Sequence, residues 1–472
     1  MLQRKAWILW VGMLLIASEV SLLALQAPAK TDSVTIGNIY LNGNKKTLRS
    51  IILRELDFEE GETVSKADFE RALVLDQQKL MNTRLFVTAE IVPLYMSDTD
   101  VEVLINMQER WYVFPVPIFR LADRNFTEWW VNQKRDFSRV NFGAQLYHMN
   151  LTGRNDRLSA KLQFGFTKQY ALDYSVPYIN KNQKLGMSFG ISFATNKAVS
   201  YASNGHRLEF YDGEDVLRRT FSTGTAFTYR PSFYTKHTWN IGYSRISVAD
   251  TVIDLNPNYL GNDQTLQEAF LLGYNFTIDK RDFVSYPLKG SVFRFDADQY
   301  GLGVFNDMNM LVTRISFAKF LDLGDKFYLA NRADLYKNFG ETIPYVRRAG
   351  FGYNPDFIRG YEKYVVESDF LLSHRTSFKY QVIEGVTNLN KRSIIPQFKT
   401  LPYAFYLKTF MDLGYSGDPL DNNENNFYNN KLIASFGLGL DIVTYYDFVM
   451  RLEFSVTEEG NTGFYFNFRS AL

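Results

Sequence analysis

One arginine stands out among the residues whose side chains could do chemistry. Arg359 lies in the stretch NPDFIRGYEKY, residues 354–364, where aromatic residues flank it and Gly360 follows it. A guanidinium can form two parallel hydrogen bonds with a carboxylate, and such a pair would fasten this stretch to another part of the protein. For an isolated Arg-Gly pair, a solvated charge beside a turn is the simpler interpretation. Arg359 therefore indicates a site only if the rest of the sequence supplies a partner.

A serine in a Gly-x-Ser-x-Gly pattern is a second candidate. Residues 186–190 match the turn that carries the nucleophile of many hydrolases. That turn needs a strand, a sharp bend and a helix, whereas LGMSFGISFATN keeps alternating past the second glycine. No Asp-His pair is recognisable beside Ser188 in the sequence. We interpret the pattern as chance and predict no catalytic residue.

The composition excludes several classes of function. The chain has no cysteine, so disulfides, a lipidated cysteine anchor and zinc-thiolate sites are excluded, and its four histidines are scattered singly. Its 52 Lys and Arg nearly balance 51 Asp and Glu, so bulk charge does not favour nucleic acid as a partner. Aromatic residues make up 16% of the chain although the mean hydropathy is -0.22. This combination is unusual for a soluble domain.

The N-terminus predicts a signal peptide over residues 1–29. An apolar run follows Arg4 and Lys5, and Ala27-Pro28-Ala29 supplies small residues for cleavage after Ala29. The alternative is an uncleaved membrane helix, but Glu19 interrupts the apolar run. After residue 30 no apolar run approaches the roughly 20 residues of a spanning helix. Membrane-spanning segments of the mature chain would therefore have to be strands.

Residues 30–110 predict a small α+β domain. VTIGNIYLN alternates like a strand, and TLRSIILREL, from Thr47, has the apolar spacing of a helix. A second helix is expected from its cap at Ser65 as far as Asn82. AEIVPLY and DVEVLINMQE then follow as two strands joined by the turn MSDTD. The expected order is β-α-α-β-β.

Residues 111–472 alternate apolar and polar residues like membrane-facing strands. In LSAKLQFGF and IASFGLGLDI every second residue is apolar, while the residues between them are mostly small or polar. In a bilayer, lipid covers the apolar face and the polar face lines a lumen; a β-sandwich or a soluble barrel is the alternative. At about 22 residues per strand, this segment holds about 16 strands. The sequence therefore predicts an all-β transmembrane barrel of about 16 antiparallel strands, closed, after the small α+β domain.

Several stretches together resemble the Omp85 superfamily, the BamA/TamA-like outer-membrane proteins with a surface antigen D15 barrel. The order of elements in residues 30–110, its NGN turn and its TRLF segment look like a single POTRA domain. FIRGYE resembles the R-G-[FY] motif on the sixth extracellular loop, and DKRDFVSYPLKG, residues 279–290, resembles the D-x-R-D-x-x-x-Y-P-x-x-G stretch. The last strand, GFYFNFRSAL, is similar to the C-terminal signal of outer-membrane barrels, with Leu472 in place of the usual aromatic residue. The resemblance covers residues 34–472.

The resemblance implies a partner for Arg359. In this family the motif arginine meets an F-x-D segment on a late strand, and this chain supplies Phe410-Met411-Asp412. The alternation independently places Lys408, Phe410 and Asp412 on the inward face. Phe357 and Tyr361 are expected to pack beside the guanidinium. The expected site residues, on the loop and on the barrel wall, are Arg359, Gly360, Tyr361, Phe410 and Asp412.

The resemblance also implies a function. Proteins of this type assist insertion and assembly of polypeptides at the outer membrane, or their translocation, without enzymatic activity, cofactor or metal. The expected partners are the outer-membrane bilayer, unfolded or nascent outer-membrane polypeptides, and accessory periplasmic or lipoprotein subunits, but no nucleic acid. The POTRA domain is expected in the periplasm. A passive pore and a structural barrel that scaffolds a surface complex remain alternatives, because the sequence has one POTRA unit where the general insertase has several.

Overall fold

The structure is a computed structural model, and the described residues are 33–121, 134–305, 308–353, 358–389, 399–417, 427–444 and 448–467. The predicted signal peptide, residues 1–29, lies outside this part of the chain, as do Phe357 and Leu472.

Residues 33–109, called the N-terminal unit from here on, form a four-stranded sheet with two helices. The strand order is β2-β1-β4-β3. The elements are β1 (Ser33–Asn42), α2 (Arg49–Leu53), β2 (Thr63–Ser65), α3 (Lys66–Asn82), β3 (Phe86–Tyr95) and β4 (Asp100–Glu109). As expected, the hydroxyl of Ser65 caps α3 by accepting the N–H of Asp68. Apolar side chains of the helices and strands share one buried core.

Two features of the N-terminal unit differ from the sequence-based expectation. An additional short strand, β2, lies between the two helices. It pairs antiparallel with the first residues of β1. A strand of three residues is too short to show a period-2 pattern, so no alternation in the sequence predicted it. The first helix is also short, since only Arg49–Leu53 is helical.

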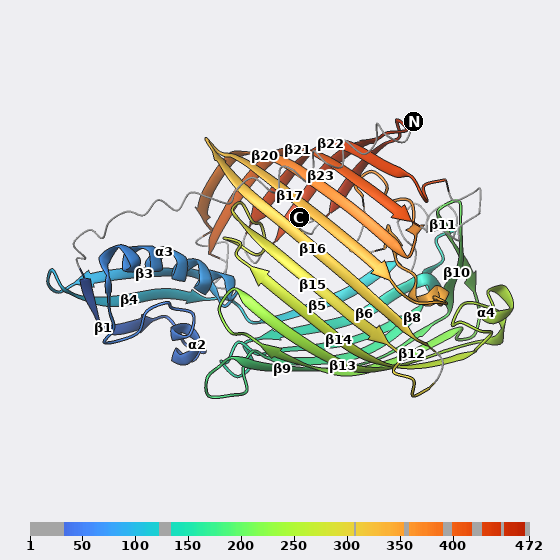
Figure 1. The fold of residues 1–472 in the computed structure, drawn as a ribbon, viewed down its shortest axis with the longest axis horizontal. Helices are drawn as coiled ribbons and strands as arrows, with labels where there is room; N and C mark the ends of the chain where they lie inside the picture. The colour runs from blue at the N-terminus through green and yellow to red at the C-terminus, as the bar shows by residue number, and fades with distance from the viewer. Residues whose placement is uncertain are drawn as a thin grey trace.

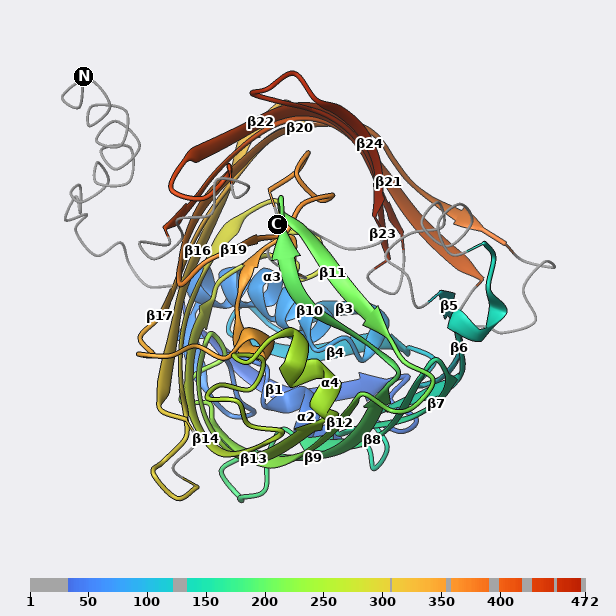
Figure 2. The same ribbon diagram turned by 90° about the vertical axis from the view of Figure 1, so that its right-hand side faces the viewer.

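Sixteen strands form one antiparallel sheet, called the large sheet, which confirms the predicted strand number. In spatial order they are β5 (Val113–Leu121), β6 (Val140–Met149), β7 (Arg157–Gly165), β8 (Thr167–Val176), β9 (Leu185–Asn196), β12 (Arg218–Tyr229), β13 (Thr235–Val248), β14 (Leu266–Asp279), β15 (Gly290–Tyr300), β16 (Met310–Gly324), β17 (Phe327–Asn338), β20 (Phe370–Asn388), β21 (Thr400–Gly417), β22 (Leu432–Thr444), β23 (Val449–Thr457) and β24 (Thr462–Asn467). The strands curve round an interior (Figure 2).

The two faces of the large sheet differ as the alternation predicts. On β22, Phe436 and Leu438 are exposed, whereas Ser435 and Asp441, which point to the other face of the same strand, are fully buried. The apolar residues therefore cover the outer face, and the polar residues face the interior. Among the described residues, no helix has the length and apolar character needed to cross a membrane.

The large sheet begins at β5 and ends at β24, and no register pair joins these two strands over the described residues. The carbonyl of Tyr112 accepts the N–H of Met149 at 2.7 Å, which fixes the alternation of hydrogen bonds between β5 and β6. Every second residue from Val113 onward therefore directs its backbone toward the open edge. Pro115 and Pro117 occupy this edge, and neither has an N–H to donate.

The N-terminal unit contacts one end of the large sheet, called the proximal end (Figure 1). Arg230, in the turn between β12 and β13, donates from both terminal nitrogens to the buried carboxylate of Glu55, at 2.9 and 2.7 Å. The side chain of Asn82 donates to the carbonyl of Asp282 at 2.7 Å and accepts the N–H of Val284 at 3.2 Å. The N–H of Leu48 also donates to the carbonyl of Gly153 at 3.0 Å, so the unit is joined to three separate turns of the large sheet.

Smaller elements gather at the opposite, distal end. They are η2 (Phe137–Arg139), the hairpin β10 (Ala198–Asn204) and β11 (Arg207–Asp212), the helix α4 (Asp250–Leu255), η3 (Tyr345–Arg347), and the short pair β18 (Gly350–Phe351) and β19 (Val366–Glu367). The hairpin, α4 and the loop after β17 share a small buried core that includes Val199, Val252 and Tyr345. Figure 2 shows the hairpin and α4 in front of the interior.

Removing the Arg230–Glu55 pair is expected to loosen the N-terminal unit. In Arg230→Ala the buried carboxylate of Glu55 loses its two-bond partner and keeps only the Nε of Arg54 at 3.2 Å. Removing one member of a buried pair costs up to about 3–5 kcal/mol. Because the chain has no cysteine, spin labels can be attached uniquely at Val74→Cys and Lys181→Cys. We expect double electron–electron resonance to give one narrow distribution of the distance between the two labels in the parent, and a broadened distribution in Arg230→Ala.

Arg71→Ala is the matched control, because its pair with Asp68 is exposed and lies within the N-terminal unit. The distribution should stay narrow in this control. An equally narrow distribution in Arg230→Ala would mean that other contacts hold the unit in place.

Candidate functional site

The loop between β17 and β20, residues 339–369, brings a buried segment into the interior. Ile358 is 0% exposed, Arg359 1% and Tyr361 2%. Burial of a charged side chain to this degree requires partners, because an unpaired charge away from water is strongly destabilising. The solvated-turn interpretation of Arg359 is therefore wrong.

Asp412, on β21, is the main partner of Arg359. The Nε of Arg359 donates to Asp412 Oδ2 at 2.8 Å, and Nη2 donates to Oδ1 at 2.5 Å. The backbone N–H of Arg359 donates to the same carboxylate at 3.1 Å. Asp412 is fully buried and faces inward, where the period-2 pattern of β21 placed it. The structure thus brings together the two residues that the family motif paired, in the planar two-bond geometry that a guanidinium favours.

The ring of Phe410 packs against the guanidinium of Arg359. The Cζ of Arg359 lies 3.9 Å from the centre of the Phe410 ring, a cation–π contact in a buried place. The ring lies across β22 where Gly437 has no side chain, because a Cβ there would come within 2.2 Å of the ring. The hydroxyl of Tyr361 donates to Glu459 at 2.8 Å and lies 3.2 Å from the carbonyl oxygen of Ala434, and its ring contacts that of Tyr428.

Gly360 lets the loop approach the wall closely. Its φ is +92°, and a Cβ would lie 3.1 Å from the Oγ of Ser455 on β23. A side chain would therefore be strained in conformation and crowded by the wall. The carbonyl of Gly360 also accepts the hydroxyl of Tyr465 on β24 at 3.2 Å, so the loop contacts the last strand of the sheet.

The charged network extends beyond the five expected residues. Arg359 also approaches Glu453 on β23 at 3.4 Å, and Glu453 pairs with Lys408 at 2.8 Å. Lys408 pairs with Asp441 on β22 at 2.5 Å, and Asp441 accepts the hydroxyl of Tyr286 at 2.9 Å. All four charged side chains are at most 2% exposed. The alternation of β21 had placed Lys408 inward; the same pattern on β22 and β23 was the signal for Asp441 and Glu453, but it does not say which charges meet.

The network connects the three family-like stretches on one wall. Tyr286 belongs to residues 279–290, the turn between β14 and β15 at the proximal end. In the same turn, Arg281 forms a two-bond pair with Asp279, at 2.8 and 2.5 Å. The ammonium nitrogen of Lys379 on β20 lies 4.1 Å from the centre of the Tyr286 ring. A chain of contacts therefore runs from the proximal turn through strands β20–β23 to the loop.

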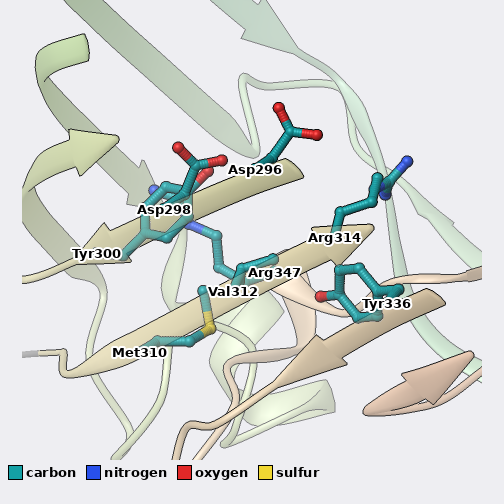
Figure 3. A pocket seen from close by; sticks show the side chains of 8 residues that line it. All are labelled: Asp296, Asp298, Tyr300, Met310, Val312, Arg314, Tyr336 and Arg347. Atoms are coloured by element: carbon teal, nitrogen blue, oxygen red, sulfur yellow. The ribbon is translucent and has the colours of Figure 1, made fainter. Parts of the chain in front are cut away.

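The other candidates from the sequence lie elsewhere. Ser188 lies inside the continuous strand β9, so the strand–turn–helix of a nucleophile elbow is not formed there. Asp296 and Asp298 lie on β15 and line a cavity of about 410 Å³ (Figure 3). Its other lining residues, from β15, β16, β17 and the loop, are Tyr300, Met310, Val312, Arg314, Tyr336 and Arg347. Carboxylates and guanidinium groups both face this space, as in a polar, hydrated interior.

Comparison with known proteins places the large sheet in a family. The family model described as the Omp85 superfamily domain matches residues 150–469. The structure is similar to BamA from Haemophilus ducreyi lacking POTRA domains 1-3, with 15% identity, a TM-score of 0.52, and coverage of 92% of this chain and 83% of that one. It is also similar to CdiB from Escherichia coli, with 11% identity, a TM-score of 0.53, and coverage of 92% and 75%. At these identities the two structures support the fold alone. No curated protein matches the sequence.

Breaking the Arg359–Asp412 pair is expected to release the loop from the wall. Removing one member of a buried pair costs about 3–5 kcal/mol, compared with about 1 kcal/mol or less for an exposed pair. Arg359→Ala should therefore make residues 339–369 sensitive to proteinase K, and Arg359→Lys should restore protection only partly, because an ammonium lacks the planar fork. Asp412→Asn should behave like Arg359→Ala, and the double variant should be little worse than either single one.

Lys289→Ala serves as the control, because it removes a 2.8 Å ion pair with Asp322 that is largely exposed to solvent. The cleavage rate of the loop should not change in this control. Strictly additive effects of the Arg359 and Asp412 substitutions would contradict the pairing.

Proposed function

The chain belongs to the Omp85 superfamily, and from this premise we propose that it assists the insertion and assembly of polypeptides at the outer membrane, or their translocation across it. The observation that carries the proposal is the edge of β5, which over the described residues has no register pair with β24, the last strand of the large sheet. An incoming strand needs such an edge to find partners for its backbone in lipid. We assign no catalytic activity and no cofactor to this process.

We propose the following layout for the chain. Residues 1–29 are a signal peptide, residues 30–110 are a POTRA domain in the periplasm, and residues 111–472 are a barrel in the outer membrane. The apolar outer face of the large sheet and the strand and helix content of the N-terminal unit support this layout. The proximal end is then the periplasmic end, and the loop that carries Arg359 enters the barrel from the cell surface.

In this layout, Pro115 and Pro117 keep the barrel from sealing permanently. A closed barrel requires hydrogen bonds between β5 and β24, but these two residues offer carbonyl oxygens and no N–H groups to that seam. Each missing donor leaves a carbonyl of the facing strand without a partner, which is costly in lipid. The seam is therefore the weakest joint of the barrel, and an arriving strand competes there with a poor native partner.

The network around Arg359 provides the fixed side of this seam. It joins the loop to β21 and β23 by ion pairs and to β24 through Tyr465. The strands next to β24 are thereby held in register while the seam opens. A passive pore would not need a buried charged network that ties the loop to the wall.

Insertion activity is expected to depend on the N-terminal unit. We expect the full chain in liposomes to accelerate folding of a urea-denatured eight-stranded outer-membrane barrel, measured by its shift on an unboiled detergent gel. A variant without residues 33–109 should lose this acceleration, because the unit is proposed to dock the client. The barrel should still form, because the hydrogen bonds that pair its strands do not involve the unit.

The shift of the protein itself between boiled and unboiled samples is the control, because a closed hydrogen-bonded sheet resists SDS. It should be retained in the shortened variant. If that variant accelerates folding as well as the full chain, the unit is not the docking site and the passive-pore alternative gains support.

Restoring the donors of β5 is expected to tighten the seam. The double variant Pro115→Val/Pro117→Val adds two N–H groups, and each new hydrogen bond contributes about 0.5–1.5 kcal/mol. We expect the unboiled band to persist to higher temperature and insertion of the denatured barrel to slow.

Phe119→Val is the matched control, because it changes a side chain on the same edge of β5 but adds no donor. Its melting temperature on the gel should match the parent. If the double variant also melts like the parent, Pro115 and Pro117 do not limit pairing at the seam.

A further inference from the structure

Strand β20 is much longer than a membrane requires. It has 19 residues, whereas its neighbour β17 has 12. A tilted transmembrane strand needs roughly 9–11 residues. The two strands are level at the distal end, where Lys337 pairs with Phe370. The excess length of β20 therefore projects at the proximal end, the end that carries the N-terminal unit (Figure 1).

Beyond Gln381 one edge of β20 has no neighbouring strand among the described residues. The N–H of Gln381 donates to the carbonyl of Lys326 at 3.0 Å, in the turn just before β17 begins. From there β20 runs on through residues 382–388, paired only with β21 on its other side. A bulge at this point, between Gln381 and Ile383, shifts the register with β21.

The hydrogen-bond alternation shows which groups face the open side. The N–H of Leu389 donates to the carbonyl of Lys399 at 2.6 Å, which places the odd-numbered residues of this segment toward β21. Glu384, Val386 and Asn388 therefore direct their N–H and C=O groups toward the open side. The side chain of Val386 is 65% exposed and that of Ile383 is 50% exposed.

Two other open edges of the sheet carry proline, whereas this one does not. Pro402 occupies the edge of β21 that faces away from β20, and its carbonyl accepts the hydroxyl of Thr444 at 3.0 Å. Pro115 and Pro117 occupy the open edge of β5. Residues 382–388 contain no proline and no lysine, the residues that most often protect an edge from pairing.

We infer that the free edge of β20, residues 382–388, binds an extended segment of an incoming polypeptide by strand addition; this rests on the proposed function. Unpaired N–H and C=O groups at alternate residues are satisfied by an extended backbone, which a lipid chain cannot supply. At about 3.3 Å per residue the edge is roughly 20 Å long, enough for a strand of about six residues. The exposed apolar side chains suit a segment destined for a membrane barrel, in which every second residue is apolar.

The test uses the full chain in liposomes and a urea-denatured eight-stranded outer-membrane barrel as the probe. A photo-crosslinking residue replaces Ile383, or in a second protein Phe464 on β24 as a reporter of the seam. V386P is then combined with the Ile383 reporter, because proline removes one edge N–H that β21 does not use. We expect the crosslink from position 383 to the probe to fall roughly fivefold, as loss of one hydrogen bond and the bulk of the ring predict.

V386T is the matched control, since it keeps the N–H, and its crosslink should equal that of the parent. The gel shift of each variant checks that the barrel is formed. If the V386P protein shows no gel shift between boiled and unboiled samples, the experiment is done with V386K instead. A lysine on an edge opposes pairing without altering the backbone.

The outcomes separate the two proposals. The inference is overturned if position 383 crosslinks only to lipid, to a second copy of this chain or to the N-terminal unit, or if V386P crosslinks the probe as well as V386T does. It is also overturned if position 464 crosslinks the probe and folding is accelerated while position 383 stays silent; the proposed function then stands. If neither position crosslinks and folding is no faster than in empty liposomes, the proposed function fails and the inference with it.

Discussion

A sheet that faces lipid must pair every backbone N–H and C=O group within itself, and this constraint shapes the rest of the molecule. The sixteen strands satisfy it side by side from β5 to β24, so unpaired groups are confined to a few places along the edges. At those edges single residues determine whether another strand can pair. Proline at positions 115, 117 and 402 removes a donor where an open edge would otherwise attract another strand, whereas Val386 leaves one in place. The distribution of donors along the edges thus defines where another polypeptide can pair with the protein.

A second constraint concerns charge inside the large sheet. Arg359, Lys408, Asp412 and Glu453 lie almost without contact with solvent, and their desolvation is costly. They offset one another because each contacts at least one opposite charge within 3.4 Å. Such an arrangement tolerates little displacement, since moving any member leaves another charge unpaired. The wall formed by β20–β23 is therefore stiffer than the wall near β5, where the inner face carries single polar contacts such as Gln145 to Ser159. Under the proposed function, movement at the seam is therefore expected on the β5 side.

Much of this could be predicted from sequence, and the remainder has identifiable physical reasons. Period-2 alternation gave the strand number and the inward direction of Asp412, because it depends only on local geometry. The family motif supplied its partner. Three-residue β2 was missed because it is too short for any period, and the pairing of Lys408 with both Asp441 and Glu453 was missed because it depends on the register of three strands. The prolines of β5 are visible in the sequence, but the edge they face follows only from the hydrogen bond between Met149 and Tyr112. The projecting edge of β20 depends on where the neighbouring strand β17 begins, and the sequence of β20 alone does not predict that position.

The proximal end combines these features in one place. The N-terminal unit is held there by Glu55, Asn82 and Leu48, which contact three different turns, so it cannot swing freely about a single joint. The free edge of β20 projects from the same end, and the donor-poor residues of β5 lie in the half of that strand nearest to it. A strand that pairs with β20 at residues 382–388 is outside the bilayer, where water still satisfies its other edge, whereas a strand at the seam has no such help. In the proposed sequence of events, pairing at β20 is therefore the less demanding step, and it would order an extended chain at the membrane surface before the seam opens.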